Sequence, residues 1–126
     1  MGQKPDIEAG SGYMAEHHEA DTFYLLSVYV PSSHSESVKE ALFEAGAGNF
    51  GLYDCCAWET RGTGQFRPLE GSDPYAGRTG EVEKAEEVKI ETVCVPSRLQ
   101  PVIDALKQAH PYETPAFQYW EVYGDI

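Results

Sequence analysis

The chain has 126 residues, which is long enough for one domain with a hydrophobic core and too short for two ordinary domains. Its formal net charge of −12 argues against binding to nucleic acid, because such a surface repels phosphate groups. No apolar run approaches the roughly 20 residues of a membrane-spanning helix, and no basic start followed by an apolar stretch marks a signal peptide. We therefore expect a cytoplasmic protein with no membrane partner.

Residues 1–21 are interpreted as an acidic leader. They lack hydrophobic periodicity and are rich in glycine, serine and acidic residues. This composition favours a flexible segment, with one helical turn expected at residues 13–18. The folded domain is predicted to span residues 22–126.

The first predicted strand ends at a proline, and a helix follows it. Aromatic and β-branched side chains fill residues 23–30, which predicts the strand. Ser33 or Ser35 is expected to cap a helix that runs to Ala45. Gly46 then supplies the left-handed residue that ends the helix.

Two strands are predicted next, separated by a loop rich in turn residues at 68–80. Residues 52–66 form the first of these strands, with a bulge or a strong bend where Gly62 and Gly64 interrupt it. Residues 81–95 form the second. Their order along the chain predicts an antiparallel pair joined by this loop.

A second helix and a last strand complete the chain. Ser97 is expected to cap the helix. The helix is predicted to end at His110, because Pro111 disfavours helical geometry in the residue before it. Residues 117–123 are predicted to form the last strand.

The combination of strand, Pro-Ser turn and helix occurs twice, at residues 28–45 and 93–109. The resulting order β-α-β-β-α-β predicts an α+β, ferredoxin-like fold, in which an antiparallel sheet carries two helices on one face and has strands one and three at its centre. These two strands have apolar residues on both faces. We therefore expect a homo-oligomer, in which other subunits or a partner cover the second face.

The three cysteines, Cys55, Cys56 and Cys94, have no CxxC spacing, which argues against a zinc knuckle or a disulfide framework. Cys55 and Cys56 are predicted to be neighbours on a strand, with their side chains on opposite faces. Buried thiols that pack as small apolar residues are the favoured interpretation.

Two glycine-rich stretches resemble nucleotide-binding loops but lack the required context. Residues 46–51 match GxGxxG, yet they follow a helix and precede a strand, which reverses the order of a dinucleotide-binding turn. Residues 71–79 have one residue too many between the glycines, and an arginine stands where a phosphate loop needs lysine. Neither stretch predicts nucleotide binding.

The sequence His-Pro-Tyr-Glu at residues 110–113 is the candidate site. An imidazole and a carboxylate three residues apart suit a metal site or an acid/base pair, so His110 and Glu113 are the candidate metal ligands. Three interpretations stay open: His110 binds backbone carbonyls at the helix end, the pair binds a ligand, or the pair takes part in catalysis. A tight transition-metal site would need further ligands, such as His34 or the neighbouring cysteines.

Four motifs add to the repeated Val-Pro strand ends. They are Ala-Gly-Ala-Gly-Asn-Phe-Gly-x-Tyr at 45–53, Gly-x-Gly-x-Phe-x-Pro at 62–68, Gly-Ser-Asp-Pro-x-x-Gly at 71–77 and His-Pro-Tyr-Glu-x-Pro-Ala at 110–116. Together they resemble the CutA-like insert domain of the YqfO branch of the NGG-interacting factor 3-like family. The resemblance covers residues 22–122.

This resemblance implies a ferredoxin-like domain similar to CutA and to the P-II signalling proteins, which are trimers with ligand or metal sites between subunits. Full-length members of the family carry the module between two lobes that hold a two-metal site. Those lobes are not in this sequence, so their metal ligands and any hydrolase activity do not carry over to it.

We predict a non-enzymatic, oligomeric binding or regulatory module, with a trimer favoured and a divalent metal ion or a small metabolite as ligand. The predicted site is a crevice between His110, Tyr112 and Glu113 and the turn that contains Gly48 and Tyr53, formed within one subunit or across an interface. One alternative is a metal-assisted, hydrolase-type enzyme that uses His110 and Glu113. The other is a docking domain for separate metal-binding lobes.

Overall fold

The computed structural model describes residues 21–126, so the predicted leader lies outside the described residues except for Asp21. The helices and strands are β1 (Asp21–Pro31), a 3-10 turn η1 (Ser32–His34), α2 (Ser35–Ala45), β2 (Ala57–Phe66), β3 (Glu83–Cys94), a 3-10 turn η2 (Pro96–Arg98), α3 (Leu99–Ala109) and β4 (Phe117–Gly124). The predicted order β-α-β-β-α-β is confirmed. No helix in this part of the chain is long and apolar enough to cross a membrane.

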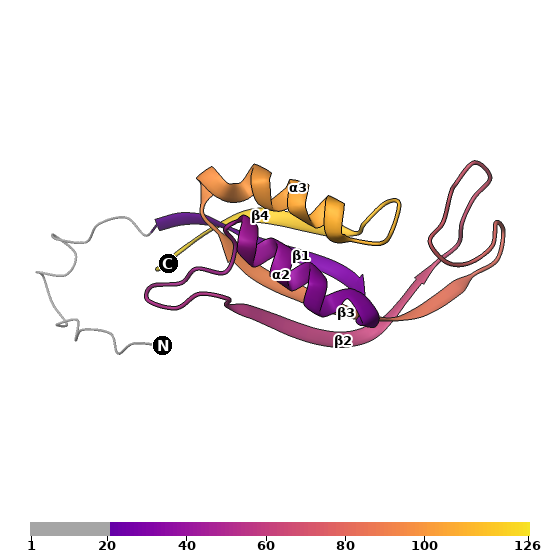
Figure 1. Cartoon of the computed structure of the whole chain (residues 1–126), viewed down its shortest axis with the longest axis horizontal. Coiled ribbons are helices and arrows are strands. Elements are labelled where there is room, and N and C mark those ends of the chain that lie inside the picture. The colour runs from indigo at the N-terminus through magenta and orange to yellow at the C-terminus, as the bar shows by residue number, and fades with distance from the viewer. Residues whose placement is uncertain (1–20) are drawn as a thin grey trace, which may run out of the picture.

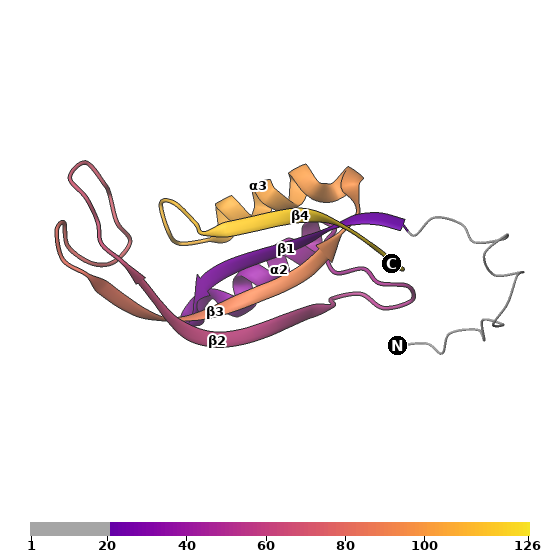
Figure 2. The ribbon, with the colours of Figure 1, turned by 180° about the vertical axis from the view of Figure 1, so that it is seen from behind.

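The four strands form one antiparallel sheet in the order β2-β3-β1-β4, with β1 and β3 at its centre as predicted. Both helices cover the same face of this sheet (Figure 1). Seen from behind, the other face carries no helix from residues 21–126 (Figure 2). The α+β, ferredoxin-like prediction is therefore confirmed in both its strand order and its two layers.

The hydrophobic core lies between the sheet and the two helices. Alternate residues of the central strands point into it, and each helix contributes pairs spaced four residues apart, so that one helical face meets the sheet. Its almost fully buried members include Leu26, Val28, Val30, Val38, Leu42, Val88, Ile90, Val102 and Leu106. Burial of such side chains contributes about 1.5–3 kcal/mol each, so this core holds the two layers together.

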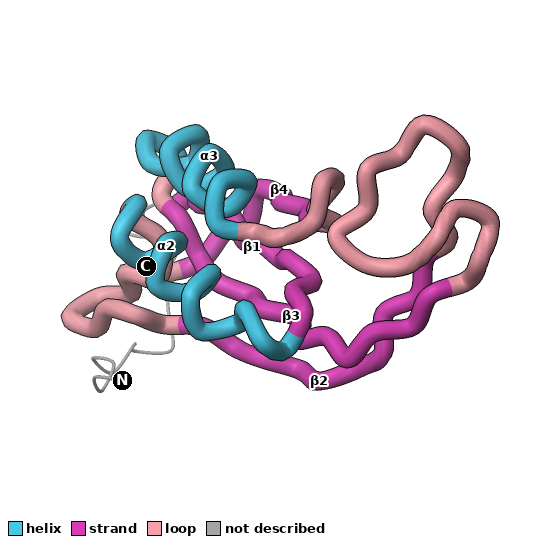
Figure 3. Tube along the Cα trace, turned by 45° about the vertical axis from the view of Figure 1, so that its right-hand side comes forward, coloured by secondary structure: helices cyan, strands magenta, loops and turns pink. Residues whose placement is uncertain are grey.

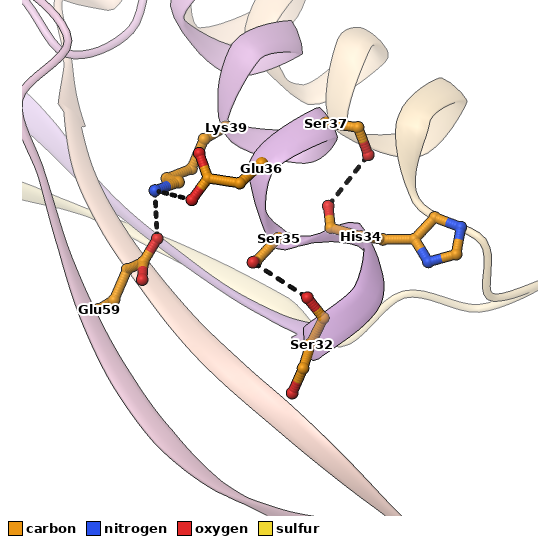
Figure 4. Close-up of polar contacts among 7 residues, drawn as sticks. All are labelled: Ser32, His34, Ser35, Glu36, Ser37, Lys39 and Glu59. Atoms are coloured by element: carbon orange, nitrogen blue, oxygen red, sulfur yellow. Dashed lines mark hydrogen bonds and ion pairs between the residues drawn. The ribbon is translucent and has the colours of Figure 1, made fainter.

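The predicted serine caps of the helices are wrong. The residues that precede α2 and α3 are His34 and Arg98, and neither makes a side-chain capping bond. A 3-10 turn leads into each helix instead, and its own backbone bonds replace the expected cap. In the first turn, the Ser35 hydroxyl donates to the Ser32 carbonyl at 3.1 Å (Figure 4).

An ion-pair network ties α2 to the edge strand β2. Lys39 Nζ lies 2.8 Å from Glu36 Oε1 and also contacts Glu59, which comes from the sheet (Figure 4). Both carboxylates raise the pKa of the Lys39 ammonium, so this side chain stays charged. The end of α2 follows the prediction, because Gly46 adopts a left-handed φ of 118°.

The second strand begins later than predicted, at Ala57. Residues 46–56 form a turn instead, in which Phe50 pairs with Tyr53. Cys55 lies in this turn, exposed and with a φ of 54°, so the prediction of Cys55 and Cys56 on a strand is wrong. Of the three thiols only that of Cys94 is buried, and burial raises its pKa.

No bulge interrupts β2 at the two glycines. The pairing of β2 with β3 runs without a break from Ala57 opposite Thr92 to Phe66 opposite Glu83. The predicted bulge at these glycines is therefore absent, and a bulge does not explain why glycine occupies the two positions.

The connections gather at two opposite ends of the sheet. The loop of residues 67–82, between β2 and β3, lies at one end together with residues 110–116, between α3 and β4 (Figure 3). The turn of residues 46–56 lies at the other end, near the C-terminus (Figure 1). This division decides which predicted site residues meet.

Candidate functional site

His110 is the buried first residue of the predicted site, with 5% of its surface exposed. Its Nε2 lies 2.7 Å from the carbonyl oxygen of Tyr29, where the pairing of β1 with β4 ends. Its Nδ1 lies 3.1 Å from the backbone nitrogen of Tyr112, which donates a hydrogen bond to it. Because one partner is an acceptor and the other a donor, the ring is neutral and carries its proton on Nε2.

This geometry favours the structural interpretation of His110, with a strand carbonyl as the partner in place of the helix-end carbonyls that we expected. Both ring nitrogens are in use, so a metal ion or a substrate proton would have to displace one of the two bonds. Burial lowers the pKa of the imidazole further, although the bond to Tyr29 opposes this effect. His110 thus fixes residues 110–113 against β1.

The lowered pKa of His110 predicts a pH-dependent stability. In the unfolded chain the imidazole titrates near its ordinary pKa of 6.5, whereas the folded chain takes up the proton only at lower pH. Below pH 6.5 the unfolded state therefore binds more protons, and the free energy of unfolding falls as the pH is lowered. Urea titrations at a series of pH values between 7.5 and 5 measure this slope. His110→Gln should flatten it, whereas His34→Gln should keep most of it, because the charge of His34 is the smallest of the effects on the pKa of His110. Equal slopes in both variants would contradict the assignment.

Tyr112 connects the same segment to the sheet and to the long loop. Its hydroxyl donates to Glu87 Oε2 at 2.9 Å, and burial together with this carboxylate raises the pKa of the phenol strongly. Its ring lies 5.6 Å from that of Phe66 and 6.0 Å from that of Tyr75, measured between centroids. Tyr112 is therefore neutral, and it contacts β3 through Glu87, β2 through Phe66 and the long loop through Tyr75.

Glu113 ties the long loop to the end of α3. Its Oε2 accepts a hydrogen bond of 2.7 Å from the backbone nitrogen of Asp73. Each of the three side chains thus contacts a different part of the fold. His110 bonds to β1, Tyr112 to β3 and Glu113 to the loop of residues 67–82. The structure brings these three predicted residues together at the end of the sheet where the loop of residues 67–82 meets residues 110–116.

The other two predicted site residues, Gly48 and Tyr53, lie at the opposite end of the sheet. The backbone nitrogen of Gly48 donates to the carbonyl of Val93, near the end of β3, and Tyr53 is exposed in the turn beyond it. This turn and residues 110–113 lie at opposite ends of the sheet (Figure 1), so within residues 21–126 of one chain they do not form the predicted crevice. Only a second subunit could bring the two groups together.

A pocket of about 410 Å³ lies where the long loop meets residues 112–116. Its walls are mainly aromatic and aliphatic, and its polar groups include three charged side chains. The lining residues are Tyr29, Gln65, Phe66, Arg67, Pro68, Leu69, Ser72, Pro74, Tyr75, Ala76, Glu87, Tyr112, Glu113, Thr114 and Ala116. Pockets of this size and character hold small organic molecules.

Most of these lining residues were missed at the level of sequence. The available signal was the length of the loop between β2 and β3, because long ordered loops in compact domains are often functional. Its tie to Glu113 spans 40 residues of sequence, which no local pattern reveals.

Gly64 leaves room for the carboxylate that holds Tyr112. A Cβ atom at Gly64 would lie 1.9 Å from Glu87 Oε1, whereas a Cβ at Gly62 would meet nothing within 4 Å. Glycine at position 64 therefore leaves the space that the Glu87 carboxylate occupies beside the pocket. This accounts for Gly64, which the predicted bulge did not.

Gly64→Ala is expected to displace Glu87 and break its bond to Tyr112, at a cost of about 1 kcal/mol in the free energy of unfolding. Gly62→Ala is the matched control and should be neutral or slightly stabilising. Urea denaturation gives both energies, and the amide shift of Tyr112 reports the broken bond. Identical behaviour of the two variants would exclude this role for Gly64.

No group of three or more His, Cys, Asp or Glu side chains within residues 21–126 is placed to hold a metal ion. The additional ligands considered for His110 and Glu113 do not join them. His34 bonds to Ser33, and Cys55 and Cys56 lie in the turn at the other end. The residues that line the pocket are suited to bind an organic molecule through aromatic rings and charged groups.

Comparison with known proteins places the chain among a defined set of relatives. No protein-family model matches it. It is 42% identical over 100 residues to a protein of Halalkalibacterium halodurans named GTP cyclohydrolase 1 type 2 homolog, a match that covers 79% of this chain and 27% of the relative. The chain thus spans about a quarter of the length of the curated relatives that it matches.

Solved structures give the same picture. The structure of a Bacillus cereus protein related to NIF3 covers 86% of this chain with a TM-score of 0.71 and 38% identity, and the match is 28% of that protein. CutA of Synechococcus elongatus matches 84% of this chain and 81% of its own length, with a TM-score of 0.59 and 18% identity. The first is a homologue, and the second shows that the fold is CutA-like.

Proposed function

We propose that this chain, a homologue of one segment of the proteins named GTP cyclohydrolase 1 type 2 homolog, is a non-catalytic module that binds a small organic molecule. The observation that carries this proposal is the pocket of about 410 Å³ at the end of the sheet. The pocket is supported by three side chains that bind three different parts of the fold. Such fixed walls favour binding, because little has to be ordered when the ligand enters.

The same contacts argue against the hydrolase-type alternative. A general acid or base needs a proton that it can exchange near neutral pH. The His110 ring uses both nitrogens in backbone bonds, and the raised pKa of Tyr112 keeps its phenol protonated. A metal ion on His110 and Glu113 would compete with the same bonds, so a metabolite is the favoured ligand.

Nuclear magnetic resonance titration of the ¹⁵N-labelled chain with a panel of neutral, cationic and anionic fragments tests the proposal. We expect several fragments to shift the amides of residues 65–76 and 112–116 in a saturable way. Tyr53 and its turn serve as an internal control and should not respond. If no fragment of any charge shifts the pocket amides, the proposed function is wrong.

We also propose that the module is a homo-oligomer whose subunits meet on the face of the sheet that lacks helices (Figure 2). Leu25, Val93 and Trp120 are paired in register on that face, and Trp58 lies further along it. Trp120 and Trp58 are 43% and 70% exposed in the single chain. Leu25, Val93 and Trp120 thus form an apolar cluster, and Glu91, which pairs with Trp58, borders it. An exposed apolar cluster with a polar rim marks an interaction surface.

Trp120→Glu is expected to convert the oligomer to a monomer, because it places a charge in the apolar interface. Tyr123→Glu is the matched control, since Tyr123 is also exposed on β4 but lies on the other face of the strand. Sedimentation equilibrium gives the masses. A monomeric wild-type chain at micromolar concentration would refute the oligomer.

A docking domain is the second candidate function, and the short match to the relatives favours it. In that case the apolar sheet face would bind the part of the longer proteins that this chain does not match. Co-purification of this chain with that separately expressed part, lost in Trp120→Glu, would support docking over self-association.

A further inference from the structure

Four aromatic side chains line the same pocket. Tyr29, Phe66, Tyr75 and Tyr112 all line it. Ring faces carry negative potential and attract cations, most strongly when the cation is partly removed from water. Walls of this composition therefore bind an apolar ligand and, in addition, favour one that carries a positive charge.

The charges of the lining residues point the same way. The lining includes two carboxylates, those of Glu87 and Glu113, and one guanidinium, that of Arg67. Each carboxylate accepts one hydrogen bond through Oε2, and within residues 21–126 its Oε1 makes no hydrogen bond. The lining therefore has more negative than positive groups, and the Oε1 atoms of Glu87 and Glu113 remain as hydrogen-bond acceptors.

The surroundings strengthen this acidic character. Glu83 lies near enough to Tyr112 to raise the pKa of its phenol as well. The whole chain carries a formal charge of −12, and a field of that sign concentrates cations and repels anions at the mouth of the pocket. Arg67 and Glu113 are both exposed, so water screens the charge of each, and the half-buried Glu87 supplies the less screened charge in the lining.

We propose, on the basis of the function proposed above, that the ligand is an organic cation, whose substituted ammonium group lies against the faces of Tyr75 and Tyr112 with Glu87 and Glu113 as its counter-charges. The rings exclude water from the cation, and the carboxylates balance its charge. A strongly hydrated metal ion gains less from such walls than an alkylated ammonium does.

Three probes of nearly equal shape test the charge preference: choline, its neutral carbon isostere 3,3-dimethyl-1-butanol, and the anion 3,3-dimethylbutanoate. Titrations followed by the pocket amides give each dissociation constant. Choline is expected to bind at least about ten-fold more tightly than the alcohol, and the anion more weakly still. Equal or weaker binding of choline, or no binding, overturns the inference.

Isosteric variants identify the groups responsible. Glu87→Gln and Glu113→Gln keep an oxygen that accepts the existing hydrogen bonds and remove the charge. Each variant should therefore bind choline about three-fold more weakly and bind the neutral alcohol with unchanged affinity. Glu70→Gln, in the same loop but outside the pocket lining, is the matched control. Arg67→Gln should strengthen choline binding.

These outcomes separate the inference from the proposed function. Fragment binding in the pocket without a preference for cations overturns the inference and leaves the binding function standing. An affinity for choline that is unchanged in both Glu87→Gln and Glu113→Gln also overturns it. If the pocket amides respond to no fragment at all, the binding function itself fails.

Discussion

Replacing His110 with alanine is expected to lower the free energy of unfolding by about 3 kcal/mol. The substitution removes a buried ring and leaves two backbone groups, the carbonyl of Tyr29 and the amide of Tyr112, without their partner. A buried polar group without a hydrogen bond costs about 1–3 kcal/mol, and the cavity adds to this cost. Urea denaturation at pH 7.5 measures the difference.

His34→Ala is the matched control for this experiment. His34 lies at the same end of the molecule, but its ring is only half-buried and its Nδ1 bonds to the neighbouring hydroxyl of Ser33. Its loss should cost less than about 1 kcal/mol, as for most substitutions of partly exposed residues. Equal losses in the two variants would mean that the His110 ring is not the anchor described here.

Replacing Tyr112 with alanine is expected to weaken fragment binding at least about ten-fold and to destabilise the chain by about 2 kcal/mol. The ring is a wall of the pocket, and it contacts the rings of Phe66 and Tyr75. Its hydroxyl also holds Glu87 in position. Binding is measured by titration of the pocket amides, and stability by urea denaturation.

Tyr112→Phe separates the two parts of this effect. It keeps the ring and removes only the bond to Glu87, so fragment binding should survive with a loss of about three-fold or less. If Tyr112→Ala binds fragments as tightly as the wild-type chain, the pocket is not the binding site.

The fold could be predicted from the sequence because its signals are local. Two copies of strand, Pro-Ser turn and helix specify the order of elements, and the apolar spacing of Val38 with Leu42 and of Val102 with Leu106 predicts which helical face meets the sheet. The left-handed end of α2 at Gly46 followed from the residue type alone. The central place of β1 and β3 then followed from the handedness of the crossovers.

The helix starts and the second strand were predicted less well, for physical reasons. Serine at a helix start suggests a cap, but short 3-10 turns supply backbone bonds that take the cap's place. The stretch from Leu52 to Cys56 reads as a strand by composition. It forms a turn because a backbone bond from Cys56 to Gly48 closes it.

The candidate site was located only in part, because its contacts are distant in sequence. His110 reaches Tyr29 across 81 residues, and Glu113 reaches Asp73 across 40. The residue types of His-Pro-Tyr-Glu suggested chemistry, whereas the structure bonds His110 to the backbone and places Tyr112 and Glu113 in the lining of the pocket. The turn of Gly48 and Tyr53 carries a specific motif, yet it lies at the far end of the sheet.

The central claim is that a small organic molecule binds in the pocket at the end of the sheet that residues 110–113 support. Intermolecular nuclear Overhauser effects between a bound fragment and the protein test it most directly. We predict contacts from the fragment to the ring protons of Phe66, Tyr75 and Tyr112. Contacts to Phe50 and Tyr53 instead, with none to the pocket rings, would contradict the account.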